Sequence, residues 1–315
     1  MAEPLSPQHR SEPPSAVPAN TQLGAKLGWA DAMMLFTAIV FGSSFPVAKP
    51  ILPAMDPFFY AAARYLLAAV AVFLYLRLRG ARLGLDNVDR KLLAVCCISF
   101  AIFQGNWAFD LTHTDASVGP IFMATSPIFG ALLARLSGHR LRPLGWIGIA
   151  LAFCGVLLVI NNSLSAITVT FDSVLYDGLW LCNAILWALF AARSPRLIAT
   201  LGAVRMSAWL MLFTALLLAP LAIWGGLRMD WPAFPPLLWL NFLYTSLITA
   251  GLASIFWNIG IGRLGITRTM IYLYLVPIFA VTIAVIFLGE VLTLARALGG
   301  VAVLIGIYIT RRAAT

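Results

Sequence analysis

Amide, hydroxyl and aromatic side chains occur inside long apolar segments of this 315-residue chain, where they could bind a small solute. Polar groups are costly in hydrocarbon unless they face the interior of a helix bundle or a water-filled cavity. Primary amides are the most informative of them, because each offers hydrogen-bond donors and acceptors. The candidate solute-binding residues near the middle of these segments are Ser43, Ser44, Gln104, Asn106, Trp107, Thr125, Asn183, Trp187, Ser254, Trp257, Asn258, Tyr272 and Tyr274.

The same residue types also have a structural interpretation. Serine and threonine let membrane helices pack closely, amides can bond one helix to the next, and tryptophan can fill space. If the residues do line a binding site, amides and aromatic rings without a charge at this depth favour a neutral, zwitterionic or amphipathic solute. Phosphate esters and nucleotide sugars would require buried arginine or lysine.

Few ionisable residues lie within or beside the apolar segments. The candidates for a gate or for ion coupling are Arg64, Asp110, His113, His139 and Glu290. Arg64 and Asp110 are expected at similar depth, which predicts an ion pair near the outer ends of their helices. No carboxylate is expected at the middle of the bilayer, so a proton relay through the core has little support. Coupling through Asp110, His113 or Glu290 stays open.

Patterns typical of enzymes are missing from the sequence. An enzyme embedded in a membrane needs clustered acids, bases or metal ligands, and the three histidines are scattered along the chain. The four cysteines lie in apolar segments without metal-ligand spacing and are expected to be buried: Cys96, Cys97, Cys154 and Cys182. The sequence therefore predicts no metal, no cofactor and no enzymatic activity, whereas composition does not exclude a channel.

The elements that would position the candidate residues are membrane helices. Of all residues, 61% are hydrophobic and 10% are charged, whereas soluble domains average about 45–50% apolar and about 25% charged residues. A membrane-spanning helix needs about 20 apolar residues. The sequence predicts an all-α polytopic membrane protein with ten transmembrane helices, at 29–48, 57–76, 92–111, 116–136, 143–160, 174–192, 205–224, 237–258, 267–288 and 293–310.

The basic residues predict how the chain crosses the membrane. With the amino terminus inside, 17 of the 21 Lys and Arg residues fall in inner loops and tails, and only Lys49, Arg228 and Arg296 fall outside. Cytoplasmic loops carry the excess of positive charge, so both termini are expected in the cytoplasm. Residues 1–25 contain five prolines and no apolar run, which predicts a disordered cytoplasmic tail. The basic residues are spread over short loops on one membrane face, which argues against nucleic acid as a partner.

An internal repeat divides the chain into two halves of five spans, 29–160 and 174–310. Three nearby offsets relate the halves: 146 for Asp31 and Phe41 with Asp177 and Trp187, 150 for Trp107 and Pro127 with Trp257 and Pro277, and 151 for Gly148 and Gly155 with Gly299 and Gly306. Both aspartates stand at helix starts, where capping is expected. Because five is odd, the second half would enter the membrane from the opposite side, as in the inverted-topology repeats of secondary transporters.

Pro127 and Pro277 lie near the middle of their spans. Each removes a helical hydrogen bond and frees the carbonyl group four residues earlier, those of Met123 and Leu273. Substrate sites of inverted-repeat carriers lie near the midplane, where helices are interrupted. The matching positions predict a pair of hinges beside such a site. The alternative is that the prolines are only tolerated.

Several stretches resemble the EamA-type family of the drug/metabolite transporter superfamily. They are Trp29 to Lys49 with Phe41-Gly42-Ser43-Ser44-Phe45, Arg64, Thr125-Ser126-Pro127-Ile128-Phe129, Gly138-His139-Arg140-Leu141, Pro277-Ile278-Phe279, Leu288-Gly289-Glu290 and Gly299. The resemblance covers residues 29–310 and is specific to the superfamily, not to a substrate. One departure is His139, where the family usually has a glutamate, whereas the second half keeps Glu290. If that position serves coupling or gating, the two halves are not equivalent.

The resemblance implies a ten-helix carrier of the inner membrane that exports small metabolites by alternating access. Members of the family handle amino acids, including aromatic ones and cysteine pathway intermediates, and other amphipathic compounds. Export of drugs, nucleosides or other solutes is the alternative within this class, and a channel or a membrane-embedded enzyme is the alternative outside it. The expected partners are a small solute and the lipid bilayer. The oligomeric state stays open, a monomer included.

Overall fold

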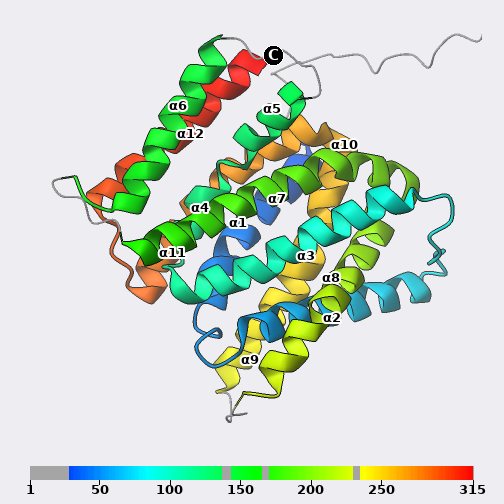
Figure 1. The fold of residues 1–315 in the computed structure, drawn as a ribbon. Helices are drawn as coiled ribbons and strands as arrows, with labels where there is room; N and C mark the ends of the chain where they lie inside the picture. Colours follow the sequence, from blue (N-terminus) through cyan, green and yellow to red (C-terminus); the bar gives the residue numbers. More distant parts are fainter. Residues whose placement is uncertain (1–27, 137–142, 165–169, 230–234, 315) are drawn as a thin grey trace, which may run out of the picture.

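A computed structural model describes residues 28–136, 143–164, 170–229 and 235–314, and all regular structure in these ranges is helical (Figure 1). The α-helices are α1 (Trp29–Ala48), α2 (Pro57–Leu78), α3 (Arg90–His113), α4 (Val118–Met123), α5 (Ser126–Leu136), α6 (Pro143–Asn161), α7 (Phe171–Leu201), α8 (Ala203–Gly226), α9 (Pro236–Leu243), α10 (Ser254–Tyr272), α11 (Val276–Leu288) and α12 (Leu294–Ala314). A π-helix, Tyr244–Ala253, joins α9 to α10, and a 3-10 turn, Leu273–Leu275, joins α10 to α11. The expected tail, residues 1–25, lies outside the described residues.

Eight helices in the described ranges are long and apolar enough to cross a membrane. Two shorter apolar helices, Val118–Leu133 and Leu294–Thr310, coincide with the fourth and tenth predicted spans. The prediction of an all-α polytopic membrane protein is therefore confirmed. The sixth span, predicted to end at residue 192, continues in α7 to Leu201, so Arg193 and Arg196 lie in a helix and not in a loop.

The cysteines are only partly as predicted. Cys96 and Cys97 are buried, whereas Cys154 and Cys182 are exposed on the outer faces of α6 and α7. An apolar segment does not reveal which of its faces meets the bundle, because lipid and the bundle interior are both apolar. A small apolar side chain is equally stable on the lipid-facing side and on the side that faces the bundle.

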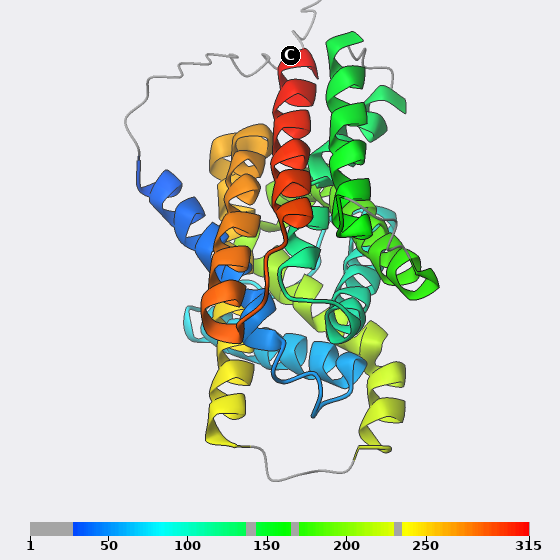
Figure 2. The same ribbon diagram turned by 90° about the vertical axis from the view of Figure 1, so that its left-hand side faces the viewer.

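Helices α6 and α12 pack along their whole length (Figures 1 and 2). A Cβ atom on Gly148 would lie 2.5 Å from the carbonyl oxygen of Gly306, and one on Gly155 would lie 2.6 Å from that of Gly299. Small residues allow such close approach of helix backbones in membranes. Higher numbers in α6 meet lower numbers in α12, so the two helices, which are equivalent in the repeat, run antiparallel.

Helices α2 and α8 form a second pair of this kind. Helix α2 begins after Asp56, whose carboxylate accepts hydrogen bonds from the backbone N–H groups of Phe58 and Phe59. Asp56 also lies against Gly225 near the end of α8. At the opposite ends the ring centroids of Phe73 and Trp209 are 5.3 Å apart. This pair is antiparallel as well, so equivalent helices of the two halves run in opposite directions.

The helices containing the two repeated prolines are interrupted just before them. Helix α4 ends at Met123, and Pro127 is the second residue of α5. Pro277 is the second residue of α11 and follows the 3-10 turn Leu273–Leu275. The freed carbonyl of Met123 accepts a bond from the Ser126 hydroxyl, and that of Leu273 accepts one from the backbone N–H of Val276. The interruptions occur where the sequence predicts them, whereas a hinge motion stays a prediction.

The π-helix marks a difference between the repeats. Helices α3 and α9 begin at Arg90 and Pro236, an offset of 146, whereas Trp107 and Trp257 are 150 apart. The second repeat therefore holds four additional residues between the helix start and the tryptophan (150 − 146). A π-helix has i to i+5 hydrogen bonds and accommodates added residues in a continuous helix.

Candidate functional site

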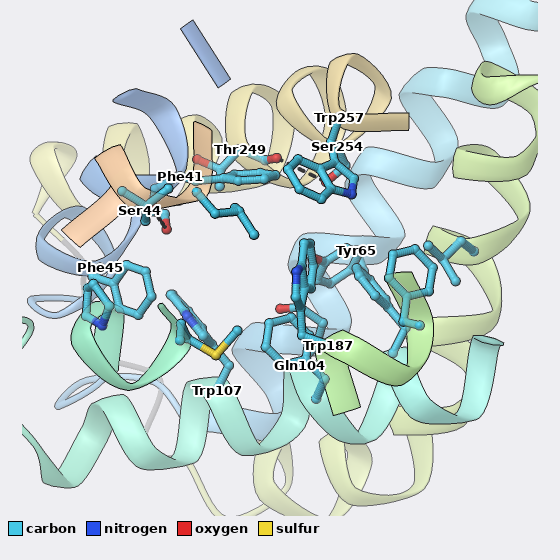
Figure 3. A pocket seen from close by; sticks show the side chains of 18 of the residues that line it. Phe41, Ser44, Phe45, Tyr65, Gln104, Trp107, Trp187, Thr249, Ser254 and Trp257 are labelled. Carbon is cyan, nitrogen blue, oxygen red and sulfur yellow. Dashed lines mark hydrogen bonds between the residues drawn. The ribbon is translucent and has the colours of Figure 1, made fainter. Parts of the chain in front are cut away.

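A central cavity opens between helices of both repeats (Figure 3). It contains about 820 Å³ of space outside protein atoms, counting its opening, and a water molecule's centre can occupy about 90 Å³ of it. Its described lining residues are Phe41, Ser44, Phe45, Arg64, Tyr65, Phe100, Phe103, Gln104, Trp107, Pro120, Met123, Ala124, Trp187, Phe190, Leu210, Thr249, Ser254, Trp257, Asn258, Leu273 and Val276.

Much of this lining consists of residues that the internal repeat relates to each other. The offset of 146 connects Phe41 with Trp187, Ser44 with Phe190 and Arg64 with Leu210, and the offset of 150 connects Gln104 with Ser254, Trp107 with Trp257 and Met123 with Leu273. Helices α2 and α8 start 146 residues apart, which supports the match of Arg64 with Leu210. The cavity therefore lies where the two repeats meet.

Nine of the 21 described lining residues are aromatic, more than of any other kind. The ring centroids of Trp187 and Trp257 are 5.4 Å apart, and Phe41 lies 6.4 and 6.2 Å from them. At the other end of the cavity the rings of Phe45 and Trp107 are 5.2 Å apart (Figure 3). Tilted and edge-on rings of this kind suit the apolar or aromatic part of a ligand.

Arg64 brings a positive charge to this aromatic wall. Its side chain is only 3% exposed, and its guanidinium carbon lies 4.7 Å from the ring centroid of Trp107 and 5.0 Å from that of Tyr65. One Nη donates to Gln104 Oε1 at 2.8 Å and the other to the Tyr60 hydroxyl at 3.3 Å. Cation–π contacts and neutral hydrogen bonds thus hold the cation in place.

Five buried polar atoms of the lining have no hydrogen-bond partner among the described residues. They are Nε of Arg64, Nε1 of Trp187, Nε1 of Trp257, Oγ1 of Thr249 and Oδ1 of Asn258. Buried polar groups in proteins are normally hydrogen-bonded, and those that are not call for an explanation. Their concentration around one cavity is the arrangement expected of a binding site for a ligand with both polar and apolar parts.

The structure brings about half of the predicted solute-binding residues together. Ser44, Gln104, Trp107, Trp187, Ser254, Trp257 and Asn258 all line the central cavity. The charge at this cavity corrects the expectation of a site without buried arginine. Arg64 was expected near the outer end of its helix, whereas it lies in the cavity wall.

The other predicted solute-binding residues lie outside the cavity lining, and most of them make structural contacts. Four of them form hydrogen bonds within the protein: Ser43 with the Tyr244 hydroxyl at 2.7 Å, Thr125 with the carbonyl of Phe122, Asn183 with Asp110, and Tyr272 with Asp31. Tyr274 packs against the hydrophobic core. Asn106 lines a separate groove with Phe58 and Leu218. The groove also contains Ile98 and Ile102, which are exposed on the outer surface. At these positions the amide and hydroxyl side chains therefore serve helix packing, as the structural alternative predicts.

Several lining residues were not singled out from the sequence. Phe100, Phe103 and Phe190 are apolar residues in apolar helices, and no sequence signal separates them from lipid-facing phenylalanines. Phe41 did carry a signal, because the repeat relates it to Trp187. Thr249 carried another as a hydroxyl residue within a span.

The predicted ion pair between Arg64 and Asp110 is wrong. Asp110 is fully buried, and its Oδ2 accepts a hydrogen bond of 3.1 Å from Asn183 Nδ2. Arg64 bonds Gln104 and Tyr60 instead, and the two groups are not within salt-bridge distance. Similar depth did not bring them together because depth fixes position along a helix and not the direction in which each side chain leaves it.

Glu290 connects the two repeats near the predicted outer ends of the helices. Its carboxylate oxygens accept hydrogen bonds from the backbone N–H groups of Ala116 at 2.6 Å and Ser117 at 3.0 Å, just before α4. A carboxylate there satisfies free N–H groups and suits the positive end of the helix. Helix α4 lines the cavity through Pro120 and Met123, so Glu290 anchors a helix of the cavity wall.

The same end of the bundle carries further contacts. Lys49 Nζ donates to the carbonyl oxygens of Leu111 at 2.7 Å and Thr114 at 2.6 Å. Burial lowers the pKa of Lys49, while the negative charges of Asp115 and Glu290 oppose this shift. The ring of His113 stacks on that of Tyr176, with centroids 4.5 Å apart. His139, the expected counterpart of Glu290, lies outside the described residues.

We expect Glu290→Ala to lower the free energy of unfolding by about 1 kcal/mol, because two N–H groups at the start of α4 lose their acceptor. Glu290→Gln keeps one amide oxygen as an acceptor and should lose less. The midpoint of thermal unfolding of the detergent-purified protein measures both effects. Equal midpoints for wild type and Glu290→Ala would contradict this role.

Asp31 connects the repeats through α1 and α10. Its Oδ2 accepts a hydrogen bond from the backbone N–H of Gly28 at 3.0 Å, which confirms the expected capping for this residue. Its Oδ1 also accepts bonds of 2.6 Å from Arg268 and from the Tyr272 hydroxyl. The cap is thus a contact between the two halves as well, which the sequence did not reveal. The same expectation of capping is wrong for Asp177, which lies within α7 because that helix begins at Phe171.

Comparison with known proteins places the chain among transporters. A model of the EamA-like transporter family matches residues 28–161 and 175–312. An uncharacterized transporter of Archaeoglobus fulgidus is 25% identical over 282 residues, covering 88% of this chain and 96% of the relative. The probable terminal-alkyne amino-acid exporter of Streptantibioticus cattleyicolor is 22% identical over 300 residues, covering 91% and 94%. One solved crystal structure superposes with a TM-score of 0.64 at 19% identity over 89% of this chain and 96% of that chain, and this likeness concerns the fold alone.

Proposed function

Because the chain belongs to the EamA-like transporter family, we propose that it exports small neutral or zwitterionic amphipathic metabolites across the inner membrane by alternating access. The observation that carries this proposal is the central cavity, which is lined by residues of both repeats and bears unpartnered polar atoms. The family match identifies the chain as a transporter, and the transporter names of the relatives agree with the expectation that it is not an enzyme.

The chemistry of the cavity supports an amphipathic solute. The rings of Phe41, Trp187 and Trp257 offer an apolar surface. The unpartnered Asn258 Oδ1 is an acceptor for a positively charged or N–H group, and the indole N–H groups are donors. A small metabolite with an apolar body and polar ends matches this set of groups.

The direction of transport and the choice of amino acids among amphipathic solutes rest on similarity. One relative is named a probable terminal-alkyne amino-acid exporter. The placement of both termini in the cytoplasm rests on the distribution of the basic residues and on the positive-inside rule. The even number of ten predicted spans agrees with that placement, and eight helices in the described ranges are long and apolar enough to cross a membrane.

Alternating access requires that one end of the cavity closes when the other opens. In our proposal, the contacts of Glu290 with α4 hold one end, and those of Asp31 with Arg268 and Tyr272 hold the other. The interruptions before Pro127 and Pro277 flank the cavity through Met123 and Leu273 and supply the hinges. Interrupted helices at the substrate site are typical of inverted-repeat carriers.

Efflux from intact cells tests the proposal. Cells that overexpress the protein are loaded with dipeptides, which release amino acids inside, and external metabolites are followed by mass spectrometry. We expect faster release of particular amino acids, and Asn258→Ala should slow it because the cavity loses an acceptor.

Asn106→Ala is the matched control, because it removes the same amide from the separate outer groove. Both variants must reach the membrane in equal amounts. Release that is identical in expressing and non-expressing cells for every amino acid would overturn the amino-acid assignment. Drugs and nucleosides would then be tested as solutes in the same assay. If Asn258→Ala and Asn106→Ala release amino acids at the same rate, the result would contradict passage of the solute through the cavity.

A further inference from the structure

The cation of Arg64 has no anionic partner within the described part of the chain. The two ion pairs found there are Arg268 with Asp31 and Arg296 with Asp115, and neither involves this residue. Its guanidinium group contacts the neutral groups of Gln104 and Tyr60 and three aromatic rings. An ionised side chain within a membrane helix is costly and normally faces a cavity, where it pairs or serves function.

The cavity as a whole is therefore positively charged. Its described lining contains Arg64 and no aspartate or glutamate. The repeat makes the contrast clear, because the equivalent lining position in the second half is Leu210. The aromatic wall is built from both halves, through Trp107 with Trp257 and Phe41 with Trp187, whereas the charge comes from the first half alone.

The surroundings of Arg64 fix its guanidinium group and leave donor capacity free. Gln104 and Tyr60 each accept from one Nη, while Nε is buried and unpartnered. A guanidinium group binds a carboxylate through a planar fork of N–H donors, and such charge-assisted bonds are about twice as strong as neutral ones. The free N–H donors of Arg64 are therefore suited to bind an anionic group of a ligand in the cavity.

We infer that Arg64 binds a carboxylate of the transported solute and selects carboxylate-bearing amphipathic solutes, zwitterions included, over their uncharged analogues. This inference rests on the proposed function and narrows its neutral or zwitterionic solutes to those with a carboxylate. One cation within an aromatic wall matches a single negative charge. A phosphate group carries more charge and would call for additional basic residues, which the described lining lacks. An amino group on the same solute would meet Asn258 Oδ1 and Thr249 Oγ1, which belong to the other repeat.

Binding to the purified full chain in detergent tests the inference without transport. The probes are two matched pairs, 3-phenylpropionate with 3-phenylpropanamide and 4-methylpentanoate with 4-methylpentanamide. The members of each pair share their apolar body and differ in charge. Quenching of tryptophan fluorescence reports binding, because Trp107, Trp187 and Trp257 line the cavity.

We expect the wild-type protein to bind each acid about tenfold or more tightly than its amide. Arg64→Gln should weaken binding of the acids by about 10–100-fold and change binding of the amides by less than about threefold, since only the charged bond is lost. Arg64→Lys keeps the charge without the planar fork and should retain part of the preference. Arg263→Gln is the matched control, because Arg263 stacks on Trp29 at 4.4 Å, is exposed and lies outside the cavity lining.

Two results would overturn the inference: equal binding of acid and amide in both pairs by the wild type, or equal weakening of both by Arg64→Gln. If Arg64→Gln gives no monodisperse protein, the preference of the wild type for acid over amide, and a smaller preference in Arg64→Lys, test the inference instead. The outcome is separable from that of the efflux assay. If the purified protein prefers acids but cells show no efflux, the proposed transport is contradicted and the anion site is supported. If cells show efflux but the purified protein has no preference for acids, the proposed transport is supported and the anion site is contradicted.

Discussion

Ser44→Phe should reduce solute transport to about a tenth of the wild-type rate or less, while the amount of protein in the membrane stays the same. Ser44 lies in the cavity wall between Phe41 and Phe45 (Figure 3), and a phenyl ring there would occupy space that the solute needs. Adding bulk to a closely packed site costs about 1–3 kcal/mol, and each 1.4 kcal/mol is about a factor of ten in binding. Initial efflux rates, normalised to protein in the membrane fraction, measure the effect.

Two controls separate blocking from other effects. Ser44→Ala removes the hydroxyl group, which bonds the Phe41 carbonyl of its own helix, and leaves the cavity open, so transport should stay near the wild-type rate. Ala150→Phe adds a similar ring on an exposed position of α6 and should have little effect. Wild-type transport by Ser44→Phe would show that the solute does not pass through this cavity.

Gly155→Ala should lower the free energy of unfolding by about 1–3 kcal/mol, the usual cost of overpacking a close contact. The added Cβ would lie 2.6 Å from the Gly299 carbonyl oxygen and 2.8 Å from the Val303 backbone nitrogen. Both are backbone atoms, so α6 and α12 would have to separate along their length. The midpoint of thermal unfolding, followed by size exclusion of detergent-purified protein, measures the loss.

Gly178→Ala is the matched control for this prediction. Gly178 is a helical glycine of α7, and no described atom outside its own stretch of helix backbone lies within 4 Å of an added Cβ. Alanine is favoured over glycine in a helix by about 1 kcal/mol, so this midpoint should stay the same or rise. The double variant with Gly299→Ala should cost less than the two single losses together, because one separation of the helices relieves both contacts. An unchanged midpoint in Gly155→Ala would refute the close packing.

Much of the fold could be predicted because the signals that specify it are long and repeated. Apolar segments of about 20 residues mark membrane helices by themselves. The glycines at an offset of 151 proved to be the contact residues of α6 and α12. The end of α7 could not be predicted in the same way, because Pro195 is a typical signal for the end of a helix and yet lies inside α7, which continues to Leu201.

The site was harder to predict because it depends on which face of each helix meets the cavity. Gln104 and Asn106 are both amides two residues apart in α3, and they point to different sides since helical neighbours recur every three or four residues. Gln104 therefore lines the cavity and Asn106 the outer groove. The almost uniformly apolar helices give little periodicity from which to read the face. The internal repeat gave additional information at some positions, because it related Trp107 to Trp257, and both residues line the cavity.

The π-helix in the second repeat has a consequence for the energetics of the cycle. A carrier built from two identical inverted halves would have two end states that are related by a two-fold rotation and equal in free energy, so its empty form would divide evenly between them. Here the four additional residues before Trp257 belong to the second half, and Arg64, the one charged residue of the described cavity lining, belongs to the first. Opening toward one side and opening toward the other therefore rearrange different contacts and differ in free energy, so the empty carrier should have a preferred resting orientation.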